Sequence, residues 1–588
     1  MTDQDQRLGP AALTRKLIRA EPERARELLD ALPLSERAAI VASRHGRERL
    51  DLILLSAEAQ ELVQALPAPE LWITIKEVGE EEAVELLRLA APAQIQHLTD
   101  LEWWHQGTLD PLAAAYWLML LSEAGSEAAV EWFRQADEEL LVTTMAKFFR
   151  VFKPDPDLSG ADPWRDQPNL FTLDDAYFLQ FFDPNAAPIL ARFLSFIRAE
   201  EPERYYGLLD MVELTVLIEQ EQAAHDFRMA RLADFGFVDF DEAIGIYAPL
   251  SDAELARLLS ESRPPAPAPV AAPAFPLATA ALPPLFGRAL AQIGDPRALS
   301  ELALGMGALV NRILIADALD LTQLESVSRA LGKAQNFVEI GLGRVSGGEI
   351  DRAVEALTNL HPFILFRAGY TRPVELARRA DRLLRAGWPA RFRARPGFLG
   401  DDGLLLEGLL RPRPQFYAGA DDRGAPLYRE FQSAAEIERA AAALLRVNAL
   451  GLVFFEVMQG SEADLSRLAD FRVGAEVPWW TVLLTATAQA LAGNEFRFAP
   501  LTLADARLAL ELLLTEARPR TVRPEIRAAL VTRAEAGLRR LASAGEAEAV
   551  LGGELVAEAL AKLEAEAAEF SLPDLDPRFF GAMIVLPE

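Results

Sequence analysis

The sequence repeats one local signal that fixes where helices begin: a Ser or Thr followed three positions later by an acidic residue. In such a capping box the hydroxyl accepts a hydrogen bond from an amide of the first helical turn, and the acidic side chain accepts one from the amide of the cap residue. Apolar residues at helical spacing follow these boxes, and period-two strand patterns are scarce. We therefore predict an all-α protein. The predicted helix starts are Thr99, Thr172, Ser251, Ser461 and Thr502.

Two apolar stretches are compatible with more than one structure. Residues 71–78 alternate like a strand, but Pro69 and Glu70 precede them as at a helix start, so we predict a helix. Residues 477–494 carry no charge, yet they include Pro, Gln, Asn and Thr, so we predict a buried helix and no membrane insertion. The first ten residues lack the basic region and apolar run of a secretion signal, so we expect a cytoplasmic protein.

An Ala- and Pro-rich segment divides the chain. Residues 262–285 contain eight prolines and one charged residue. Because proline fixes φ and lacks a backbone donor, this segment is predicted to be an extended linker. We therefore predict an acidic helical-repeat domain over residues 1–261 and a second, mainly α-helical domain over residues 286–588. Residues 153–169 are predicted to form a loop, and residues 389–426 to form short strands or irregular loops.

The charge of the chain is unevenly distributed. Residues 1–261 hold 23 Lys and Arg against 48 Asp and Glu, whereas residues 262–588 hold 36 against 40. Phosphate groups require a basic surface, so we expect no nucleic-acid partner. The Arg-rich run from Arg378 to Arg395 is predicted to be a solvated helix face and the loop after it. An acidic first half would instead attract a basic protein partner.

The first half has a weak internal rhythm, in which Pro33, Pro67 and Pro92 each stand near a helix start after an apolar helix end. The spacings are uneven, which favours an irregular α-solenoid. At these junctions residues 21–110 resemble the cytosolic helical N-domain of MgtE-type magnesium transporters, and more distantly the armadillo-like middle of flagellar motor-switch proteins. The resemblance implies an armadillo-like, right-handed helical superhelix. It does not imply a transporter, because neither a membrane domain nor a tandem nucleotide-sensing domain follows.

The chain as a whole resembles an uncharacterised bacterial family known only as a domain of unknown function. The residues that carry this resemblance are RMARLADFGFVDFDEAIGIY (228–247), HPFILFRAGYTRPVELARRADRLL (361–384) and PWWTVLLTATAQAL (478–491). The resemblance implies no activity, cofactor or site residue.

The inventory for catalysis and metal binding is small, with no Cys and five His. Glu221 and His225 are four residues apart on one predicted helix face, but a metal site needs three or four ligands, so we predict a surface charge pair. The glycines of residues 341–348 lack the preceding strand of a dinucleotide loop and are predicted to form a turn between helices. We expect no catalytic, cofactor-binding or metal-binding residue.

The segment after this helix contains the candidate partner-binding residues. Gly236 is predicted to end one helix, and Asp239 to cap the next, with Asp241 near its positive end. These roles leave Phe235 and Phe237 unexplained. Their rings are predicted to pack in the core or, with Asp239 and Asp241, to form a partner-binding site.

These observations favour a non-catalytic cytoplasmic scaffold or adaptor that binds a protein partner through an acidic helical surface. Two alternatives remain. One is a divalent-cation-responsive regulatory module, in which carboxylates from different helices bind Mg²⁺ or Ca²⁺. The other is an enzyme of unrecognised type in the C-terminal half, with acidic residues, Tyr or Arg performing the chemistry.

Overall fold

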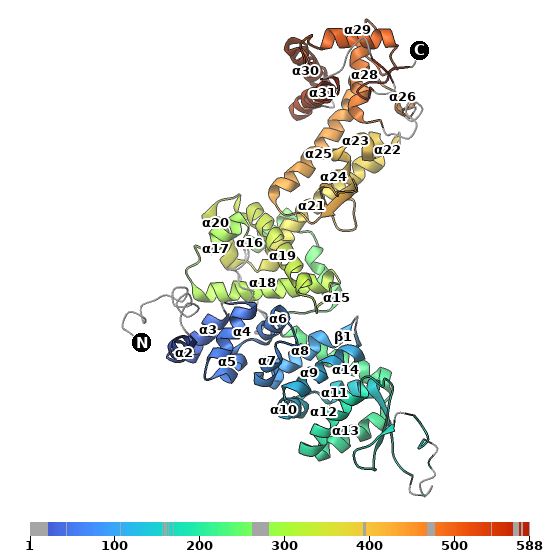
Figure 1. Cartoon of the computed structure of the whole chain (residues 1–588). Coiled ribbons are helices and arrows are strands. Elements are labelled where there is room, and N and C mark those ends of the chain that lie inside the picture. Colours follow the sequence, from blue (N-terminus) through green and yellow to red (C-terminus); the bar gives the residue numbers. More distant parts are fainter. Residues whose placement is uncertain are drawn as a thin grey trace. The chain divides into compact units, whose positions relative to one another are not determined.

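The computed structural model shows a mainly helical chain with a few short strands (Figure 1), which confirms the predicted all-α class. It describes residues 22–586 apart from residues 43, 106, 156, 158–161, 163, 169, 261–281, 392–395, 467, 469–476, 542–543, 569–574 and 578–579. The chain forms two compact units. The first contains residues 1–248, 252–338 and 345–366, and the second contains residues 249–251, 339–344 and 367–588.

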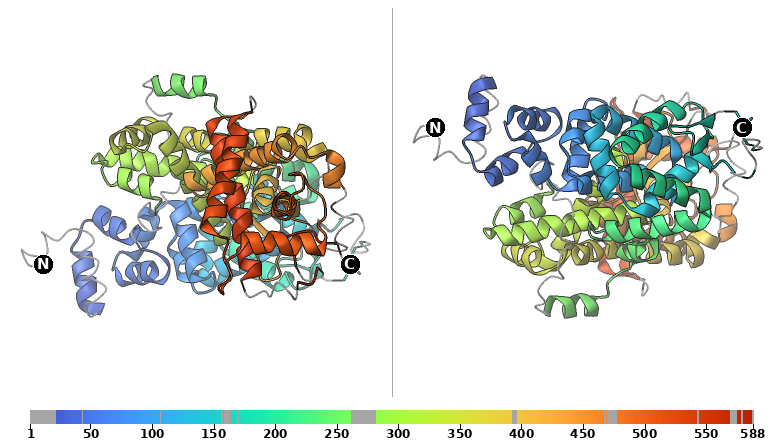
Figure 2. Two further views of the ribbon diagram at one scale, coloured as in Figure 1. Left: turned by 90° about the horizontal axis from the view of Figure 1, so that it is seen from above. Right: turned by 90° about the horizontal axis from the view of Figure 1, so that it is seen from below.

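The first unit begins with a run of short helices. They are α2 (Pro22–Asp30), α3 (Leu34–Ala42), α4 (Gly46–Leu55), α5 (Ala59–Ala65), α6 (Ala68–Val78), α7 (Val84–Leu89), α8 (Pro92–Glu102), α9 (Pro111–Ala124), α10 (Ser126–Gln135) and α11 (Glu138–Phe148). Helices two apart along the chain pack together: α4 on α6, α5 on α7, α6 on α8 and α7 on α9. Figure 2 shows these helices following one another in a row. The segment predicted as either strand or helix lies within α6, so the helix prediction is confirmed.

Short antiparallel strands interrupt these helices. They are β1 (Trp104–His105), β2 (Thr108–Leu109), β3 (Phe149–Phe152), β4 (Leu170–Phe171) and β5 (Phe178–Phe181). The first two form a hairpin, and the others form a sheet in the order β3-β5-β4, with Phe149 opposite Phe181. These strands frame part of the predicted loop over residues 153–169. Trp103 and Trp132 pack in the neighbouring core with their ring centroids 5.4 Å apart.

The remaining helices of the first unit come from both sides of the predicted linker. They are α12 (Ala187–Glu200), α13 (Pro202–Leu214), α14 (Leu217–Ala233), α15 (Phe240–Ala243), η3 (Ile244–Tyr247), α16 (Asp252–Ser260), α17 (Pro284–Leu290), α18 (Pro296–Ala316), most of α19 (Leu324–Ser346) and α20 (Ile350–Asn359). Asn311 of α18 donates a hydrogen bond to the carbonyl of Phe235 at 2.7 Å. Tyr247 donates to Asp317 at 2.5 Å, and Lys333 donates to the same carboxylate at 2.9 Å.

The division into compact units therefore differs from the predicted boundary. Most of the segment over residues 262–285 lies outside the described residues, and α17 begins within its last residues. Helices α18 to α20 join the unit that precedes the linker, whereas the prediction placed them in a domain over residues 286–588. The contacts that join them connect residues 70 or more positions apart, which local patterns do not report.

The second unit is a helical assembly with one β-hairpin. Its elements are the C-terminal part of α21 (Pro362–Ala386), α22 (Trp388–Arg391), α23 (Pro396–Leu399), α24 (Asp401–Leu409), β6 (Phe416–Ala420), β7 (Pro426–Arg429), α25 (Ala434–Leu452), the π-helical η4 (Val453–Val457), α26 (Glu462–Ser466), α28 (Trp479–Leu491), α29 (Leu503–Leu513), α30 (Pro524–Arg539) and α31 (Glu546–Ala567). Helix α31 packs against α25, α28 and α30. Strand β6 lies in the stretch over residues 389–426 predicted to hold short strands or loops, and β7 begins at its end. Helix α28 is the buried helix predicted over residues 477–494.

Three predicted helix starts are confirmed. Helix α16 begins directly after Ser251. The Ser461 hydroxyl accepts from the amide of Asp464 at 3.2 Å, and the Asp464 carboxylate accepts from the amide of Ser461 at 2.9 Å. The Thr502 hydroxyl accepts from the amide of Asp505 at 3.1 Å.

The other two predicted starts are wrong. Thr99 lies inside α8, where its hydroxyl donates to the carbonyl of Gln96 at 2.8 Å, because Pro92 already begins this helix. Thr172 caps a turn in which its hydroxyl accepts from the amide of Asp175 at 2.9 Å. Asp175 has a φ of 56°, which is incompatible with continuing into a right-handed helix. The same side-chain chemistry serves turns and helices, so spacing alone does not separate them.

Two helices are long and apolar enough to cross a membrane by length and composition, over Pro296–Ala316 and Ala434–Val457. About half of each apolar window is buried inside the protein, at 56% and 50%. Core helices of soluble proteins pass the same test, so this feature is weak evidence for a span.

The packing of Gly451 against Trp388 in the second unit can be tested by a single methyl group. A Cβ at Gly451 would lie 2.3 Å from a carbon of the Trp388 ring. We therefore expect Gly451→Ala to displace this ring and lower the free energy of unfolding by about 1–3 kcal/mol, measured by urea denaturation.

Gly332→Ala in α19 is the matched control, since among the described residues no atom outside its own stretch of helix backbone lies within 4 Å of its added Cβ. This change should stabilise the protein by about 0.5–1 kcal/mol through helix propensity. Equal stability of the two variants would contradict the close approach of Gly451 and Trp388.

Candidate functional site

The predicted partner-binding segment joins α14 to α15 as its sequence indicates. Gly236, with a φ of 84°, follows the last turn of α14. The Asp239 carboxylate accepts a hydrogen bond from the amide of Glu242 at 2.8 Å and so caps α15. Asp239 and Asp241 are both exposed.

The two aromatic residues of this segment pack inside the first unit. Phe237 is 5% exposed and lines a small cavity of about 30 Å³, open to solvent, together with His97 and Asn311. Phe235 is half-buried, and its ring centroid lies 4.1 Å from that of His97. The packing interpretation therefore accounts for both rings, whereas Asp239 and Asp241 remain on the surface as candidates for a partner.

Glu221 and His225 have separate partners. The Glu221 carboxylate accepts from the amide of Leu109 at 2.8 Å and pairs with Lys147 at 2.6 Å, which ties α14 to β2 and α11. The His225 ring packs 5.8 Å from that of Trp104. Within the described ranges, no three His, Cys, Asp or Glu residues are placed to share a metal ion. The predicted charge pair of Glu221 with His225 is therefore wrong, because the Glu221 carboxylate pairs with Lys147 from α11 instead.

The glycine-rich residues 341–348 form no phosphate-binding loop. Gly341 and Gly343 lie within α19, and Gly347 and Gly348 have φ values of 65° and 86° between α19 and α20. This confirms the predicted turn between helices. The Arg side chains of α21 at positions 378, 379, 382 and 385 are exposed, as on a solvated face.

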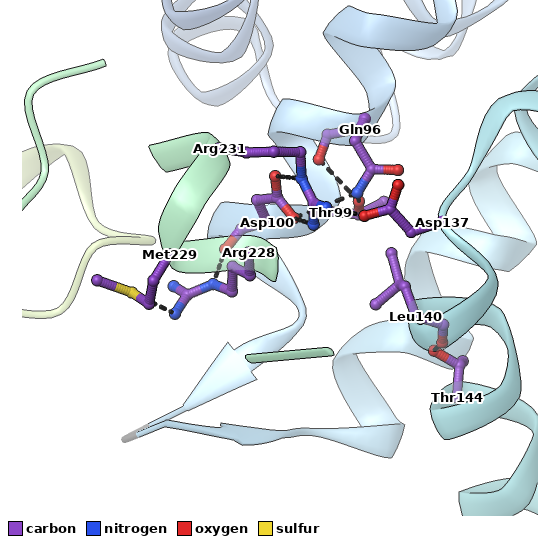
Figure 3. Close-up of polar contacts among 9 residues, drawn as sticks. All are labelled: Gln96, Thr99, Asp100, Asp137, Leu140, Thr144, Arg228, Met229 and Arg231. Atoms are coloured by element: carbon purple, nitrogen blue, oxygen red, sulfur yellow. Dashed lines mark hydrogen bonds and ion pairs between the residues drawn. The ribbon is translucent and has the colours of Figure 1, made fainter. Parts of the chain in front are cut away.

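A buried charge cluster fastens α14 to the helices beside it (Figure 3). Its centre is the Asp100 carboxylate of α8, which is 2% exposed. Arg231 of α14 donates to both carboxylate oxygens, at 2.8 and 2.6 Å, and Gln96 donates to one of them at 3.2 Å. The same guanidinium also pairs with Asp137 at the start of α11. The bidentate geometry makes this an orienting contact as well as an ion pair.

A second guanidinium reinforces the cluster. Arg228 is 6% exposed and donates through Nε to the carbonyl oxygen of Asp100 at 2.6 Å, with its guanidinium 5.3 Å from the Trp104 ring centroid. Burial lowers the pKa of Arg228 to about 10. Burial raises the pKa of Asp100, and the hydrogen bonds from Arg231 oppose that rise. Because Arg231 of α14 binds carboxylates of α8 and of the residue before α11, the cluster holds α14 against both helices.

His97 lies one turn before Asp100 on α8 and is buried. Its Nδ1 has no hydrogen-bond partner among the described residues, and burial lowers its pKa to about 3. The neutral ring is therefore the form that the folded protein holds at neutral pH.

The junction between α13 and α14 exposes three apolar side chains that sequence reasoning missed. Leu214, Val216 and Ile218 are 82%, 62% and 82% exposed. We call residues 214–218 the exposed apolar segment. Its letters, LTVLI, resemble a buried strand, and the only sequence sign of exposure is its place between two helices with Glu213 and Glu219 on its flanks.

Acidic side chains border the exposed apolar segment. Lys153 binds both Asp210 at 2.7 Å and Glu213 at 2.6 Å, and Tyr177 donates to Asp210 at 2.6 Å. These contacts hold the pKa of Asp210 below its usual range. Glu219, on the other flank, is exposed.

Replacing Arg231 tests whether the buried cluster holds α14 in place. Arg231→Met leaves the Asp100 carboxylate buried without its bidentate partner, so we expect a loss of about 3–5 kcal/mol in the free energy of unfolding. Arg297→Met is the matched control, because the Arg297 side chain is 86% exposed and pairs with Glu301 on the surface. That change should stay within about 0.5 kcal/mol. Similar losses in both variants by urea denaturation would contradict the role of the cluster.

The burial of His97 predicts a pH dependence with a definite sign. The unfolded chain takes up this proton near pH 6.5, whereas the folded protein does so only near pH 3. Stability is thus fully present above pH 6.5 and lost as pH falls, at about 1.4 kcal/mol per pH unit. Between pH 7 and pH 5 the native protein should lose about 2 kcal/mol relative to His97→Phe. Parallel pH profiles of the two proteins in urea denaturation would show that burial does not suppress this protonation.

Comparison with known proteins gives a family and no further neighbour. Residues 26–586 match the family described as "Family of unknown function (DUF6178)". No curated protein and no solved structure is significantly similar to the chain. The resemblance to the MgtE N-domain therefore rests on the proline-marked helix junctions alone. Because the match covers nearly the whole chain, this protein belongs to the DUF6178 family.

Proposed function

We propose that this protein is a non-catalytic cytoplasmic scaffold or adaptor whose first unit binds a basic protein partner through an acidic helical surface. The observation that carries the proposal is the exposed apolar segment, with Leu214, Val216 and Ile218 in solvent. Single exposed apolar residues are ordinary, but several within five consecutive positions are typical of a binding surface.

The surrounding charge indicates the chemistry of the partner. Glu213 and Glu219 flank the exposed apolar segment, and the chain up to residue 261 has about twice as many acidic as basic residues. Asp239 and Asp241 add exposed negative charge to the same unit. An amphipathic helix with Lys and Arg beside its apolar face matches such a surface, since charge complementarity steers association and apolar contact holds the complex.

The anchoring of α14 supports binding at its N-terminal end. Arg231 fixes the C-terminal half of the helix to Asp100, and Glu221 fixes its middle to Lys147. Ile218 lies in the first turn of the same helix, before both anchors. A surface that is already ordered loses less conformational entropy when a partner binds.

The form of the first unit completes the proposal. Packing between helices two apart along α4 to α9 is what a helical-repeat superhelix requires, so we include an irregular, armadillo-like solenoid in it. Such repeats present extended surfaces, on which scaffold proteins assemble partners.

The experiment is affinity purification of the tagged full-length protein from its own cells, with mass spectrometry of bound proteins. Leu214→Ser with Ile218→Ser removes the apolar surface. Leu112→Ser with Leu508→Ser is the matched control, since these residues are 70% and 45% exposed elsewhere in the chain. We expect a stoichiometric partner containing a basic amphipathic helix, reduced at least tenfold only by the first pair of substitutions.

A synthetic peptide of that helix should then bind the purified protein in fluorescence anisotropy, and more weakly as NaCl increases. Circular dichroism of each variant checks that the helices persist. Equal recovery of the partner by both double variants, or no stoichiometric partner for the native protein, would refute the proposal.

A further inference from the structure

The second unit contains an apolar cavity between its helices. Its volume is about 100 Å³, and its mouth is open to solvent. Val453, Leu483 and Val556 form its deep wall and are 2%, 2% and 7% exposed. Phe496 and Leu530 are half-buried and lie nearer its mouth. The cavity thus has a buried apolar end and an end open to water.

Arg533 of α30 is the single charged residue in the cavity lining. Arginines on either side of it along α30 are paired, Arg527 with Glu564 at 2.6 Å and Arg539 with Glu546 at 2.8 Å. Among the described residues Arg533 has no carboxylate partner, and its guanidinium lies 5.9 Å from the Phe496 ring centroid. The Arg533 charge is therefore free to bind an anion at the mouth.

The lining offers little other polar chemistry. The hydroxyl of Thr487 donates to the carbonyl of Leu483 at 2.8 Å, so its hydrogen is already used within α28. A sugar, nucleotide or peptide would bury several polar groups in such a cavity without partners, which costs free energy for each.

The backbone of the cavity wall departs from regular helix at this place. Helix α25 continues as the π-helical turn η4, whose residues Val453 and Val457 both line the cavity. The amide of Met458 donates to the carbonyl of Val453 at 2.9 Å, five residues earlier, which widens the turn. Short π-helical segments inside α-helices are frequent at functional sites. Ala534 of α30 also lines the cavity, and its small side chain leaves space there.

We propose that this cavity binds a free medium-chain aliphatic carboxylate. Its alkyl chain would lie against Val453, Leu483 and Val556, and its carboxylate would pair with Arg533 at the mouth. Apolar burial favours the chain, and the unpaired guanidinium favours an anionic head over a neutral or cationic one. The inference is independent of the partner proposed for the first unit.

Isothermal titration calorimetry of the full-length protein tests this inference. The probes are decanoate below its micellar concentration, decanol and decyltrimethylammonium. We expect one decanoate per chain, with decanol and the cationic probe binding at least tenfold more weakly. A shorter and a longer carboxylate, hexanoate and tetradecanoate, should define an optimum chain length.

Two substitutions separate the charge from the cavity. Arg533→Gln should lower decanoate affinity about tenfold and bring it close to that of decanol. Arg540→Gln is the matched control, since Arg540 is an exposed arginine beyond the end of the same helix and outside the cavity lining. Ala534→Leu should fill the cavity and abolish binding of decanoate and decanol alike, with an unchanged circular dichroism spectrum.

Several outcomes would overturn the inference. They are no binding at any chain length, equal affinities for decanoate and decanol, and equal weakening by Arg533→Gln and Arg540→Gln. If Ala534→Leu fails to fold, the Arg533→Gln and Arg540→Gln pair still decides, because both residues are on the surface. Arg533-dependent binding to phosphatidylglycerol vesicles, in the absence of decanoate binding, would assign the site to a lipid headgroup and refute a free carboxylate ligand.

Discussion

The bidentate pair of Asp100 and Arg231 is the interaction on which the candidate surface of the first unit depends. It joins residues 131 positions apart and brings α14 onto α8 and α11. Burying two charges is costly unless each is paired and hydrogen-bonded, and here Gln96 and Arg228 supply the additional contacts. A helix held in this way has its ends at fixed positions. The junction of α13 and α14 is therefore ordered, and its exposed side chains form a defined surface.

Much of the local structure could be predicted from the sequence, because helix starts and ends depend on residues close together in the chain. The caps at Ser461, Thr502 and Asp239, the turn after Gly236 and the helix over residues 71–78 all follow from a few neighbouring residues. The prediction of a helix start at Thr172 was wrong because the Thr172 hydroxyl accepts the same hydrogen bond in a turn that it would accept in a helix cap. The capping boxes and helical spacing likewise predicted the all-α class without locating the hairpins.

What sequence reasoning missed depends on contacts between distant residues. Nothing near Leu214 or Ile218 distinguishes an exposed apolar run from a buried one, since burial is decided by α11, β3 and α8 packing elsewhere. Arg533 is likewise one of many arginines in the sequence. Only the structure shows that Arg527 and Arg539 pair with Glu564 and Glu546, whereas Arg533 has no carboxylate partner in the described part of the chain. Phe237, which was chosen as a candidate from a local motif, is buried in the first unit.

The two units also differ in what they offer a ligand. The first presents carboxylates and apolar side chains on its surface, which suits a macromolecule of opposite charge. The second encloses an apolar volume with one cation at its mouth, which suits a small amphipathic anion. The two proposals thus assign the protein partner and the small molecule to different units.

The first unit takes helices from both sides of the stretch between α16 and α17. A protease that cleaved there would cut the chain without dividing the unit, because Asn311 with Phe235 and Arg312 with Glu242 would still join the two fragments. The entropy of closing a loop grows only with the logarithm of its length, so insertions or deletions in this stretch would cost the fold little. In the evolution of the family, the length of this connection is therefore free to change, while the contacting faces of α18 and α15 are constrained to change together.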